Sequence, residues 1–253
     1  MNNKNKKSIL NIESYANYLE QWLLRQLKIT NTKGIVFGLS GGIDSAVVAG
    51  IAKTIVPQNH LAVVMHINNS SLDFKCTNEI TKKFKLIFQN LDLNLSLKTL
   101  IETLNLDLKK DINIIGNLKA RLRMVSLYAL AQKKNYLVCG TSNYDEWMTG
   151  YFTKYGDSAC DIALLRNCLK SDIYELGNYY SVPKIIMERK PTASLFPNQT
   201  DEKDLKIKYD ELDSYWLNNK LLNDAKVKCI KNLVNQSNHK RKLPLAPKNR
   251  FQF

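Results

Sequence analysis

The feature that most constrains the fold is a short glycine-rich loop between an apolar segment and a run of small residues. The loop reads Gly-Leu-Ser-Gly-Gly-Ile-Asp-Ser over residues 38–45. It follows Ile35-Val36-Phe37 and precedes Ala46-Val-Val-Ala-Gly50. Glycines let backbone N–H groups approach an anion closely, and a helix that starts here turns its positive end toward the same point. This order of strand, loop and helix therefore predicts a phosphate site at the start of an α/β unit.

The polar residues of the loop indicate which phosphate chemistry it serves. It is not a Walker loop, because no lysine precedes its last serine and its glycine spacing is different. Ser40 and Ser45 can donate hydrogen bonds to phosphate oxygens. Asp44 would repel those oxygens unless a divalent cation lay between them. The loop therefore predicts bound Mg²⁺ as well as bound phosphate.

The loop resembles the signature loop of the ATP pyrophosphatases, which cleave ATP between the α and β phosphates to activate a substrate as its adenylate. The loop alone does not choose among NAD synthetase, the GMP and argininosuccinate synthetases, asparagine synthetase and the tRNA-thiolating enzymes. The resemblance implies an ATP-binding loop made of Gly38, Leu39, Ser40, Gly41, Gly42, Ile43, Asp44 and Ser45.

Apolar periodicity predicts that strands and helices alternate along the chain. We predict helices at 8–28, 44–55, 77–89, 99–110, 114–133 and 171–180, and strands at 33–39, 61–67, 91–97 and 136–141. Continuous apolar strands such as 61–67 are typical of a parallel sheet buried on both faces. The expected fold is α/β: a doubly wound, flavodoxin- or Rossmann-like parallel sheet with helices on both faces. The resemblance to the ATP pyrophosphatases implies the adenine nucleotide alpha hydrolase-like type of this fold. Ligands should gather where the strand order reverses.

Composition bounds the class of protein. No apolar run approaches the ~20 residues that cross a bilayer, and the start lacks a signal-peptide core, so we expect a cytoplasmic protein without membrane contact. We expect one domain over residues 1–253, with a helical part from about 195 that includes 201–217 and 221–235. The five cysteines are odd in number and form no Cys-x-x-Cys pair, which argues against disulfides, structural zinc and sulfur transfer: Cys76, Cys139, Cys160, Cys168 and Cys229.

The net charge of +14 suggests an anionic partner. However, the lysines are spread over segments such as 82–83, 109–110 and 206–208, and no zinc-finger spacing or aromatic RNA motif accompanies them. A nucleotide-handling enzyme with a basic surface accounts for the same charge, so we expect no nucleic-acid partner.

A second polar segment follows the predicted strand at 136–141. It reads Gly-Thr-x(4)-Glu-x-x-Thr-Gly-x-Phe-Thr-Lys-Tyr-Gly-Asp from Gly140 to Asp157. This pattern resembles the NAD synthetase motif, and further matches lie at 117–124, 190–193, 199–213 and 239–241. Residues 57–116 match poorly. The segment 66–75 lacks the family's Gln- and Asp-rich loop, which leaves the contacts on the adenine side open.

The resemblance implies a ligase that adenylates the carboxylate of deamido-NAD with ATP and Mg²⁺, releases pyrophosphate, and lets ammonia displace AMP. It assigns ATP contacts to Thr141, Lys170 and Thr192, and Mg²⁺ to Asp44 and Glu146. It places deamido-NAD at Arg121, Lys154, Asp161, His239 and Lys240.

The residue types agree with this chemistry. Mg²⁺ and the Lys170 ammonium would neutralise charge that grows on the pyrophosphate leaving group. The second step needs neutral ammonia, so a carboxylate that binds ammonium and takes its proton is required, and Asp157 is the candidate. Asp44, Lys170 and Asp157 are thus the predicted catalytic residues.

Two predictions concern partners. The synthetase segment starts within the first 35 residues, which leaves no room for a fused glutaminase, although a separate glutaminase partner stays open. The resemblance implies a homodimer, with helix 114–133 near the interface and deamido-NAD bound across it. Two other functions remain alternatives: a tRNA-thiolating or tRNA-lysidine ATP pyrophosphatase, favoured only by the charge, and a nucleotide- or nucleic-acid-binding module that kept the fold without catalysis.

Overall fold

The fold centres on a parallel sheet whose strand order reverses beside the glycine-rich loop. The computed structural model describes residues 11–67, 70–193, 195–196 and 199–247. In this part of the chain five parallel strands pair in the order β3-β2-β1-β4-β5. The strands are β1 (Gly34–Gly38), β2 (His60–His66), β3 (Phe88–Asp92), β4 (Tyr136–Gly140) and β5 (Ile162–Ala163). β2 and β3 lie on one side of β1, and β4 and β5 lie on its other side. This order confirms the predicted doubly wound α/β fold.

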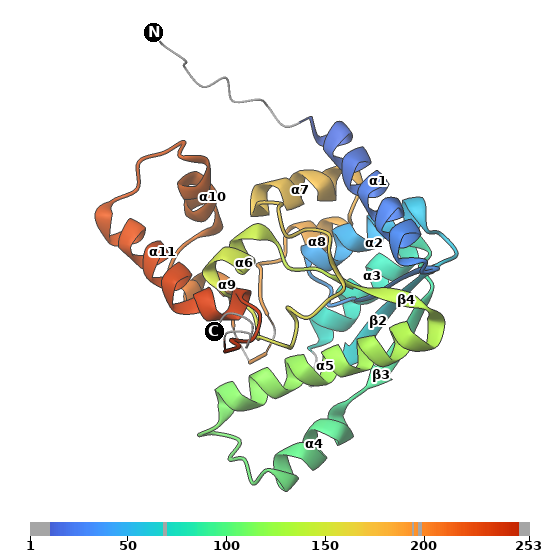
Figure 1. The fold of residues 1–253 in the computed structure, drawn as a ribbon, viewed down its shortest axis with the longest axis horizontal. Helices are drawn as coiled ribbons and strands as arrows, with labels where there is room; N and C mark the ends of the chain where they lie inside the picture. The colour runs from blue at the N-terminus through green and yellow to red at the C-terminus, as the bar shows by residue number, and fades with distance from the viewer. Residues whose placement is uncertain (1–10, 68–69, 194, 197–198, 248–253) are drawn as a thin grey trace.

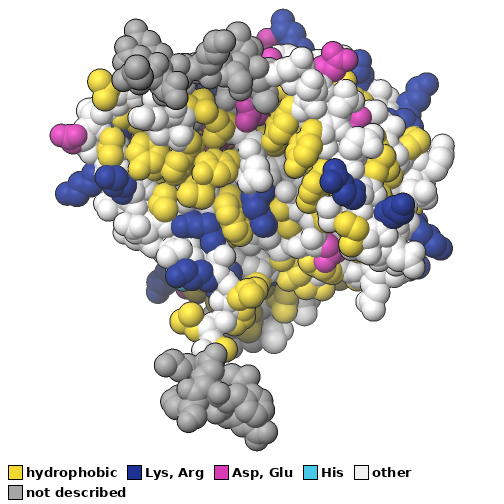
Figure 2. Space-filling model, turned by 45° about the horizontal axis from the view of Figure 1, so that its top comes forward, with side chains coloured by type: hydrophobic (Ala, Val, Ile, Leu, Met, Phe, Trp, Pro, Cys, Tyr) yellow, Lys and Arg dark blue, Asp and Glu magenta, His cyan; other side chains and the backbone are white. Residues whose placement is uncertain are grey.

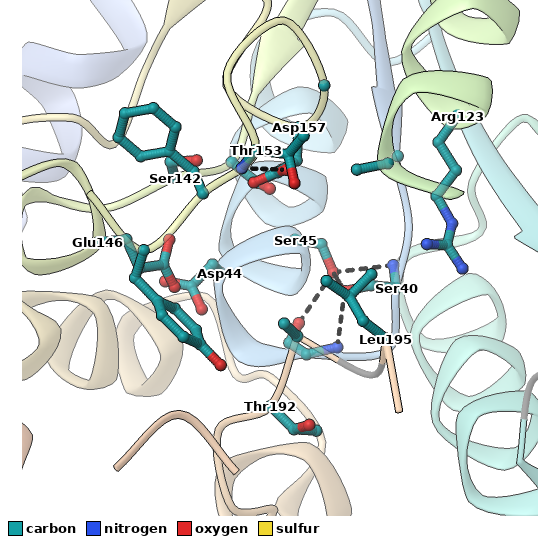
Figure 3. A pocket seen from close by; sticks show the side chains of 18 of the residues that line it. Ser40, Asp44, Ser45, Arg123, Ser142, Glu146, Thr153, Asp157, Thr192 and Leu195 are labelled. Carbon is teal, nitrogen blue, oxygen red and sulfur yellow. Dashed lines mark hydrogen bonds between the residues drawn. The ribbon is translucent and has the colours of Figure 1, made fainter. Parts of the chain in front are cut away.

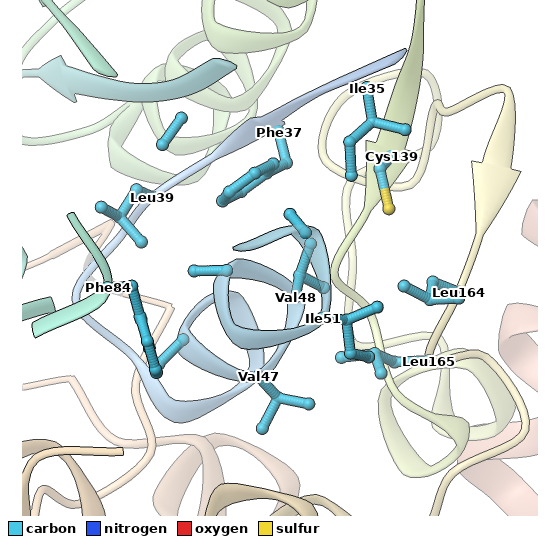
Figure 4. Close-up of a cluster of buried hydrophobic side chains, with 14 of the residues drawn as sticks. Ile35, Phe37, Leu39, Val47, Val48, Ile51, Phe84, Cys139, Leu164 and Leu165 are labelled. Atoms are coloured by element: carbon cyan, nitrogen blue, oxygen red, sulfur yellow. The ribbon is translucent and has the colours of Figure 1, made fainter. Parts of the chain in front are cut away.

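Helices cover both faces of this sheet (Figure 1). One face carries α1 (Ile12–Thr30), α2 (Ile43–Ile55), α3 (Ser71–Phe84) and α7 (Lys170–Tyr179). The other carries α5 (Ile112–Lys134), which packs in turn against α4 (Asn94–Thr103). Successive strand residues point to opposite faces. Accordingly Ile35 and Phe37 are buried with α2 in the larger core (Figure 4), and Val36 is buried with α5.

The C-terminal part of the described chain is helical. Its elements are α8 (Lys184–Met187), α9 (Asp201–Leu205), α10 (Tyr209–Leu217), α11 (Asp224–Ser237) and the 3-10 helix η1 (Asn238–Arg241). α9, α10 and α11 pack around a small core of their own, whereas Ile186 of α8 is buried in the larger core. α10 contacts α7, and α11 contacts α6 (Tyr144–Thr149), the short helix after β4 (Figure 1). These contacts place α10 and α11 against α7 and α6, the helices that follow β5 and β4 in the chain.

The predicted elements between residues 77 and 110 are wrong in position. Helix α3 begins at Ser71, where Ser70 and Asp73 form a capping box, and ends before Lys85, which has φ 47°. Of the predicted strand 91–97, only Leu91 and Asp92 lie in a strand. β3 ends at Asp92, and α4 then runs over 94–103 instead of 99–110. The alternating leucines of 91–97 satisfied a strand pattern, but Leu97 is buried against α5, and this packing favours a helix.

The surface agrees with a diffuse basic charge. On the face in Figure 2, Lys and Arg side chains are scattered among apolar and uncharged ones and form no continuous stripe. Across the described ranges, no helix is long and apolar enough to cross a membrane. All five cysteines are free thiols, and Cys76, Cys139 and Cys168 are buried.

Candidate active site

A cavity of about 550 Å³ opens at the carboxyl ends of β1 and β4, where the strand order reverses. Its wall is formed by the glycine-rich loop, one side of α5, the segment after β4 and residues from 189 to 204 (Figure 3). Ligands of doubly wound sheets bind at this position, and the volume lies within the usual range for small-molecule sites. The cavity is therefore the candidate active site.

The side chains of Ser40 and Ser45 form hydrogen bonds with the backbone of the glycine-rich loop. Ser45 Oγ donates to Gly42 O at 2.9 Å, and Gly42 N donates to Ser40 Oγ at 3.2 Å. Gly41 has φ 79°, which disfavours any other residue, and a Cβ there would lie 2.9 Å from Cys76 Cβ. α2 begins at Ile43, so the loop and the positive end of a 13-residue helix face the cavity together.

An arginine–aspartate pair in the cavity wall contacts the loop. Arg189 Nη2 lies 2.5 Å from Asp73 Oδ1, and Arg189 Nη1 donates to Gly41 O at 3.3 Å. Burial acts to raise the pKa of Asp73, but hydrogen bonds from Arg189 and Ser70 outweigh it and hold that pKa below its ordinary value. The sequence did not predict this pair, because Asp73 lies in the segment that matched no known pattern.

Lys170 and Asp44 form the central ion pair of the cavity. Lys170 Nζ lies 2.6 Å from Asp44 Oδ2, and Asn143 Nδ2 donates to Asp44 Oδ1 at 2.9 Å. Burial acts to lower the pKa of Lys170, but the Asp44 and Glu146 carboxylates overcome this and raise it. The pKa of Glu146 is raised well above its ordinary value by burial and by the nearby charge of Asp44. The structure thus brings the predicted residues Asp44, Glu146 and Lys170 together.

A buried carboxyl group holds Lys170 from behind. Asp145 is fully buried and accepts from the backbone N of Lys170 at 2.9 Å and from Trp216 Nε1 at 2.8 Å. Burial and the charge of Asp213 raise the pKa of Asp145 to about 7. Tyr209 of α10 places its ring 5.0 Å from Lys170 Nζ. These contacts were not predicted, because the residues of α10 reach the cavity only through tertiary packing.

Asp157 also lines the cavity, and Figure 3 shows it beside Thr153. Its Oδ1 accepts from Thr153 N at 2.9 Å, and Thr153 Oγ1 donates to Asn117 Oδ1 at 2.8 Å. Enclosure by protein raises the pKa of Asp157 above its ordinary value, while the Thr153 bonds and the charge of Lys240 act in the opposite direction. A carboxyl with a raised pKa can accept and hold a proton closer to neutral pH.

The other predicted ligand residues are divided between the cavity and the surface. The cavity wall includes Thr141, Thr192, Lys240 and every predicted loop residue except Gly41. Lys240 Nζ donates to Gly150 O at 2.8 Å and to Phe152 O at 2.9 Å.

The four remaining residues predicted for deamido-NAD lie outside this wall. Arg121 is exposed and donates to Lys154 O at 3.3 Å, and Lys154 Nζ donates to His239 O at 2.9 Å. Asp161 Oδ2 accepts from Val138 N at 2.7 Å. The structure thus joins Arg121, Lys154 and His239 at one place, and their role in binding stays a prediction.

Asp44 and Glu146 both line the cavity and could supply carboxylate oxygens to a metal ion. No group of three or more His, Cys, Asp or Glu side chains that could hold a metal occurs in the described residues. Mg²⁺ needs fewer, because it usually binds one or two carboxylates and completes its shell with substrate phosphates and water. Two carboxylates beside the glycine-rich loop fit this requirement, and burial together with the charge of Asp44 raises the pKa of Glu146.

Several known proteins are similar to this chain. The NAD synthase family model matches residues 15–244. The NH(3)-dependent NAD(+) synthetase of Mycoplasma genitalium is 49% identical over 96% of this chain and 98% of its own length. That of Mycoplasma pneumoniae is 46% identical, with the same coverage. Among solved structures, NMN synthetase from Francisella tularensis has a TM-score of 0.89 at 36% identity, covering 95% of this chain and all of its own.

Proposed function

The chain belongs to the NAD synthase family, and from this membership we infer that it is an ammonia-dependent NAD synthetase, a ligase that forms a C–N bond. ATP activates the nicotinate carboxylate of deamido-NAD as its adenylate, and ammonia displaces AMP to give NAD. The observation that supports this best is the Lys170–Asp44 ion pair at the mouth of a phosphate loop. The ammonium group of Lys170 provides a fixed positive charge where pyrophosphate leaves.

In the first step a carboxylate oxygen of deamido-NAD attacks the α-phosphorus of ATP, and the bond to the pyrophosphate oxygen breaks. The amide groups of the loop and the positive end of α2 hold the phosphates, and Ser40 and Ser45 donate to their oxygens. Lys170, buried and charged, faces the negative charge that accumulates on the leaving pyrophosphate.

In the second step ammonia attacks the carbonyl carbon of the adenylate and AMP leaves. Ammonium predominates at neutral pH, so a group in the cavity must take its proton. We propose Asp157 for this role, since its carboxylate lines the cavity and its pKa is raised toward the range of a useful base.

We propose that Asp44 and Glu146 hold Mg²⁺ when ATP is bound. The cation supplies positive charge that offsets the phosphates as pyrophosphate departs. Asp44 would then contact both the cation and Lys170. Its two carboxylate oxygens already have different partners, since Oδ1 accepts from Asn143 and Oδ2 from Lys170.

We further propose a cytoplasmic homodimer in which the chain acts as a single domain. Helix α5 supports this assembly because several of its apolar side chains are exposed, including Ile114 (52%) and Val125 (59%). Deamido-NAD would contact Arg121, Lys154, Asp161, His239 and Lys240, with ATP also touching Thr141, Thr192 and Lys170.

A second candidate substrate is suggested by the similarity to NMN synthetase. That name indicates a mononucleotide product, so nicotinate mononucleotide could take the place of deamido-NAD. The activated group and the chemistry would be the same.

The experiment that tests the function measures product from deamido-NAD or nicotinate mononucleotide with ATP and Mg²⁺, using ammonium chloride or glutamine as the nitrogen source. AMP and pyrophosphate are quantified alongside, and Asp44→Ala is the inactive control. NAD made one-to-one with AMP from ammonium alone supports the proposal. NMN without NAD would move the substrate to the mononucleotide. Neither product, from folded protein that binds ATP, would contradict amidation and favour a tRNA-modifying role.

A further inference from the structure

Arg123 differs from Lys170 and Arg189, two other cations of the cavity wall. Lys170 is paired with Asp44, and Arg189 is paired with Asp73. Arg123 also lines the cavity, and Figure 3 shows its guanidinium extending from α5 toward the side where Ser40 lies. However, it forms no hydrogen bond or ion pair with any residue that the structure describes.

An unpaired guanidinium in this position is costly. It has five N–H donors and stays protonated in proteins, so it cannot relieve the cost of burial by losing its charge. Burial lowers the pKa of Arg123, and the charges of Asp157 and Asp73 only partly offset this effect. A ligand anion would satisfy both the charge and the donors.

A second cation lies close by on the same helix. Lys119 precedes Arg123 by one helical turn, and burial together with the charge of Arg123 lowers its pKa. Lys119 Nζ donates to Leu195 O at 2.9 Å, which holds it beside the cavity. Two like charges held together in a protein favour an anion between or beside them.

We propose that Arg123 binds a phosphate group of a nucleotide substrate in the cavity. Phosphate fits better than a carbonyl or a hydroxyl, because a guanidinium forms two parallel hydrogen bonds with phosphate oxygens. This inference rests on the proposed function, which brings two phosphate-bearing ligands, ATP and deamido-NAD, into the same cavity. Arg123 is none of the residues to which the motif resemblance assigned a role.

The test compares Arg123→Met and Arg123→Lys with Lys133→Met, which removes a charge from the exposed far end of α5. ATP and deamido-NAD are titrated separately by calorimetry, so that no turnover occurs. The expected result is that Arg123→Met weakens one of the two ligands by about tenfold to a hundredfold, the range for a hydrogen bond to a charged group. Arg123→Lys should lie between the wild type and Arg123→Met, because it keeps the charge and loses the paired bonds. Lys133→Met should bind both ligands as the wild type does.

Each outcome decides a point. If only the affinity for ATP falls, the phosphate that Arg123 binds belongs to ATP. If only the affinity for deamido-NAD falls, that phosphate belongs to the dinucleotide. Unchanged affinity for both ligands overturns the proposal. If Arg123→Met does not fold, Arg123→Lys decides, and wild-type affinities there overturn it. Titrations do not require amidation, so a protein that binds ATP through Arg123 but makes no NAD would refute only the proposed function.

Discussion

The ammonium group of Lys170 lies 2.6 Å from Oδ2 of Asp44, across 126 residues of sequence. The Lys170 side chain is 3% exposed and that of Asp44 is 17% exposed, so water screens the pair poorly. Lys170 is the first residue of α7 and Asp44 is the second residue of α2, and these two helices are in contact. The pair therefore fixes both the charge of the site and the position of the phosphate loop.

We expect Lys170→Met to reduce NAD formation by about a hundredfold or more, because the leaving pyrophosphate loses a preorganised charge. The variant should also lose about 3–5 kcal/mol of stability, since Asp44 remains partly buried without its partner. Steady-state kinetics and denaturant unfolding measure the two effects. Lys184→Met is the matched control, because Lys184 is exposed and its ion pair with Glu188 lies at the surface. Wild-type kcat in Lys170→Met would contradict the assigned role.

Removal of the divalent cation should stop NAD formation, and added Mg²⁺ should restore it. Glu146→Gln should raise the Mg²⁺ concentration for half-maximal rate by about tenfold or more, since even outer-sphere partners of metal ligands contribute that much. The rate is titrated with Mg²⁺ at saturating ATP. Glu13→Gln, an exposed change on α1, should behave as the wild type. An identical Mg²⁺ dependence in Glu146→Gln would argue against Glu146 as a ligand.

The elements with strong local signals were predictable. β1 is a contiguous apolar segment, and α2 is a run of small residues that follows the glycine-rich loop. Both occur where the sequence pattern predicted them. Residues 88–103 were not predictable in this way. β3 is an edge strand with mostly exposed side chains, so no burial pattern marks it. The leucines that follow it alternate like a strand, and only packing against α5 selects the helix.

The same limit applies to the site. The loop residues were identifiable because they are contiguous and their chemistry is local. Arg189 and Asp73 are 116 residues apart, and Trp216 and Asp145 are 71 residues apart. Neither pair has a local signal, because each exists only after distant elements have packed. The position of Arg123 in the cavity wall could not be predicted for a different reason. Which residues of α5 face the cavity depends on how the helix is oriented on the sheet.

The buried His60 predicts that stability falls in mild acid. Its Nδ1 donates to Val56 O at 2.9 Å and its Nε2 accepts from Ile87 N at 3.0 Å, so the folded state requires the neutral ring. Burial lowers the pKa of His60, and Lys53 adds to this, while the Val56 contact acts against it. The unfolded chain then takes up a proton first, so stability falls as pH drops below the ordinary histidine value of about 6.5.

Denaturant unfolding at pH 7.5 and at pH 5.5 tests this expectation. His60→Gln should be less stable at pH 7.5 by about 1–3 kcal/mol, because it disturbs buried hydrogen bonds. It should nevertheless lose less stability on acidification than the wild type. His239→Gln, at an exposed site, should follow the wild type at both values. Equal acid losses in all three proteins would mean that His60 does not set the pH dependence.

The proposed dimer can be tested on the exposed side of α5. Val125 is 59% exposed, and a glutamate there would place a charge in an apolar contact between subunits. Light scattering should give twice 29.0 kDa for the wild type and a shift toward 29.0 kDa for Val125→Glu. Ile29→Glu on α1 is the control, since Ile29 is 69% exposed. A wild-type protein that is monomeric at micromolar concentration would refute the dimer.

The support behind Lys170 gives the last prediction. Trp216 donates through Nε1 to Asp145, which also accepts from the backbone of Lys170. Trp216→Phe keeps an aromatic ring next to Tyr144 but removes the N–H. A buried carboxyl then lacks one donor, which should cost about 1–3 kcal/mol of stability. Because Asp145 also positions the first residue of α7, we expect kcat to fall as well.

Tyr215→Phe separates this effect from general damage to α10. The Tyr215 hydroxyl makes no hydrogen bond with the described residues, and its ring lies edge-on to Trp216 at 4.8 Å. This variant should keep both the stability and the kcat of the wild type. A Trp216→Phe protein that is destabilised but has normal kcat would show that Asp145 stabilises the fold without positioning Lys170. If Trp216→Phe loses both stability and kcat while Tyr215→Phe loses neither, the Trp216–Asp145 hydrogen bond acts on Lys170.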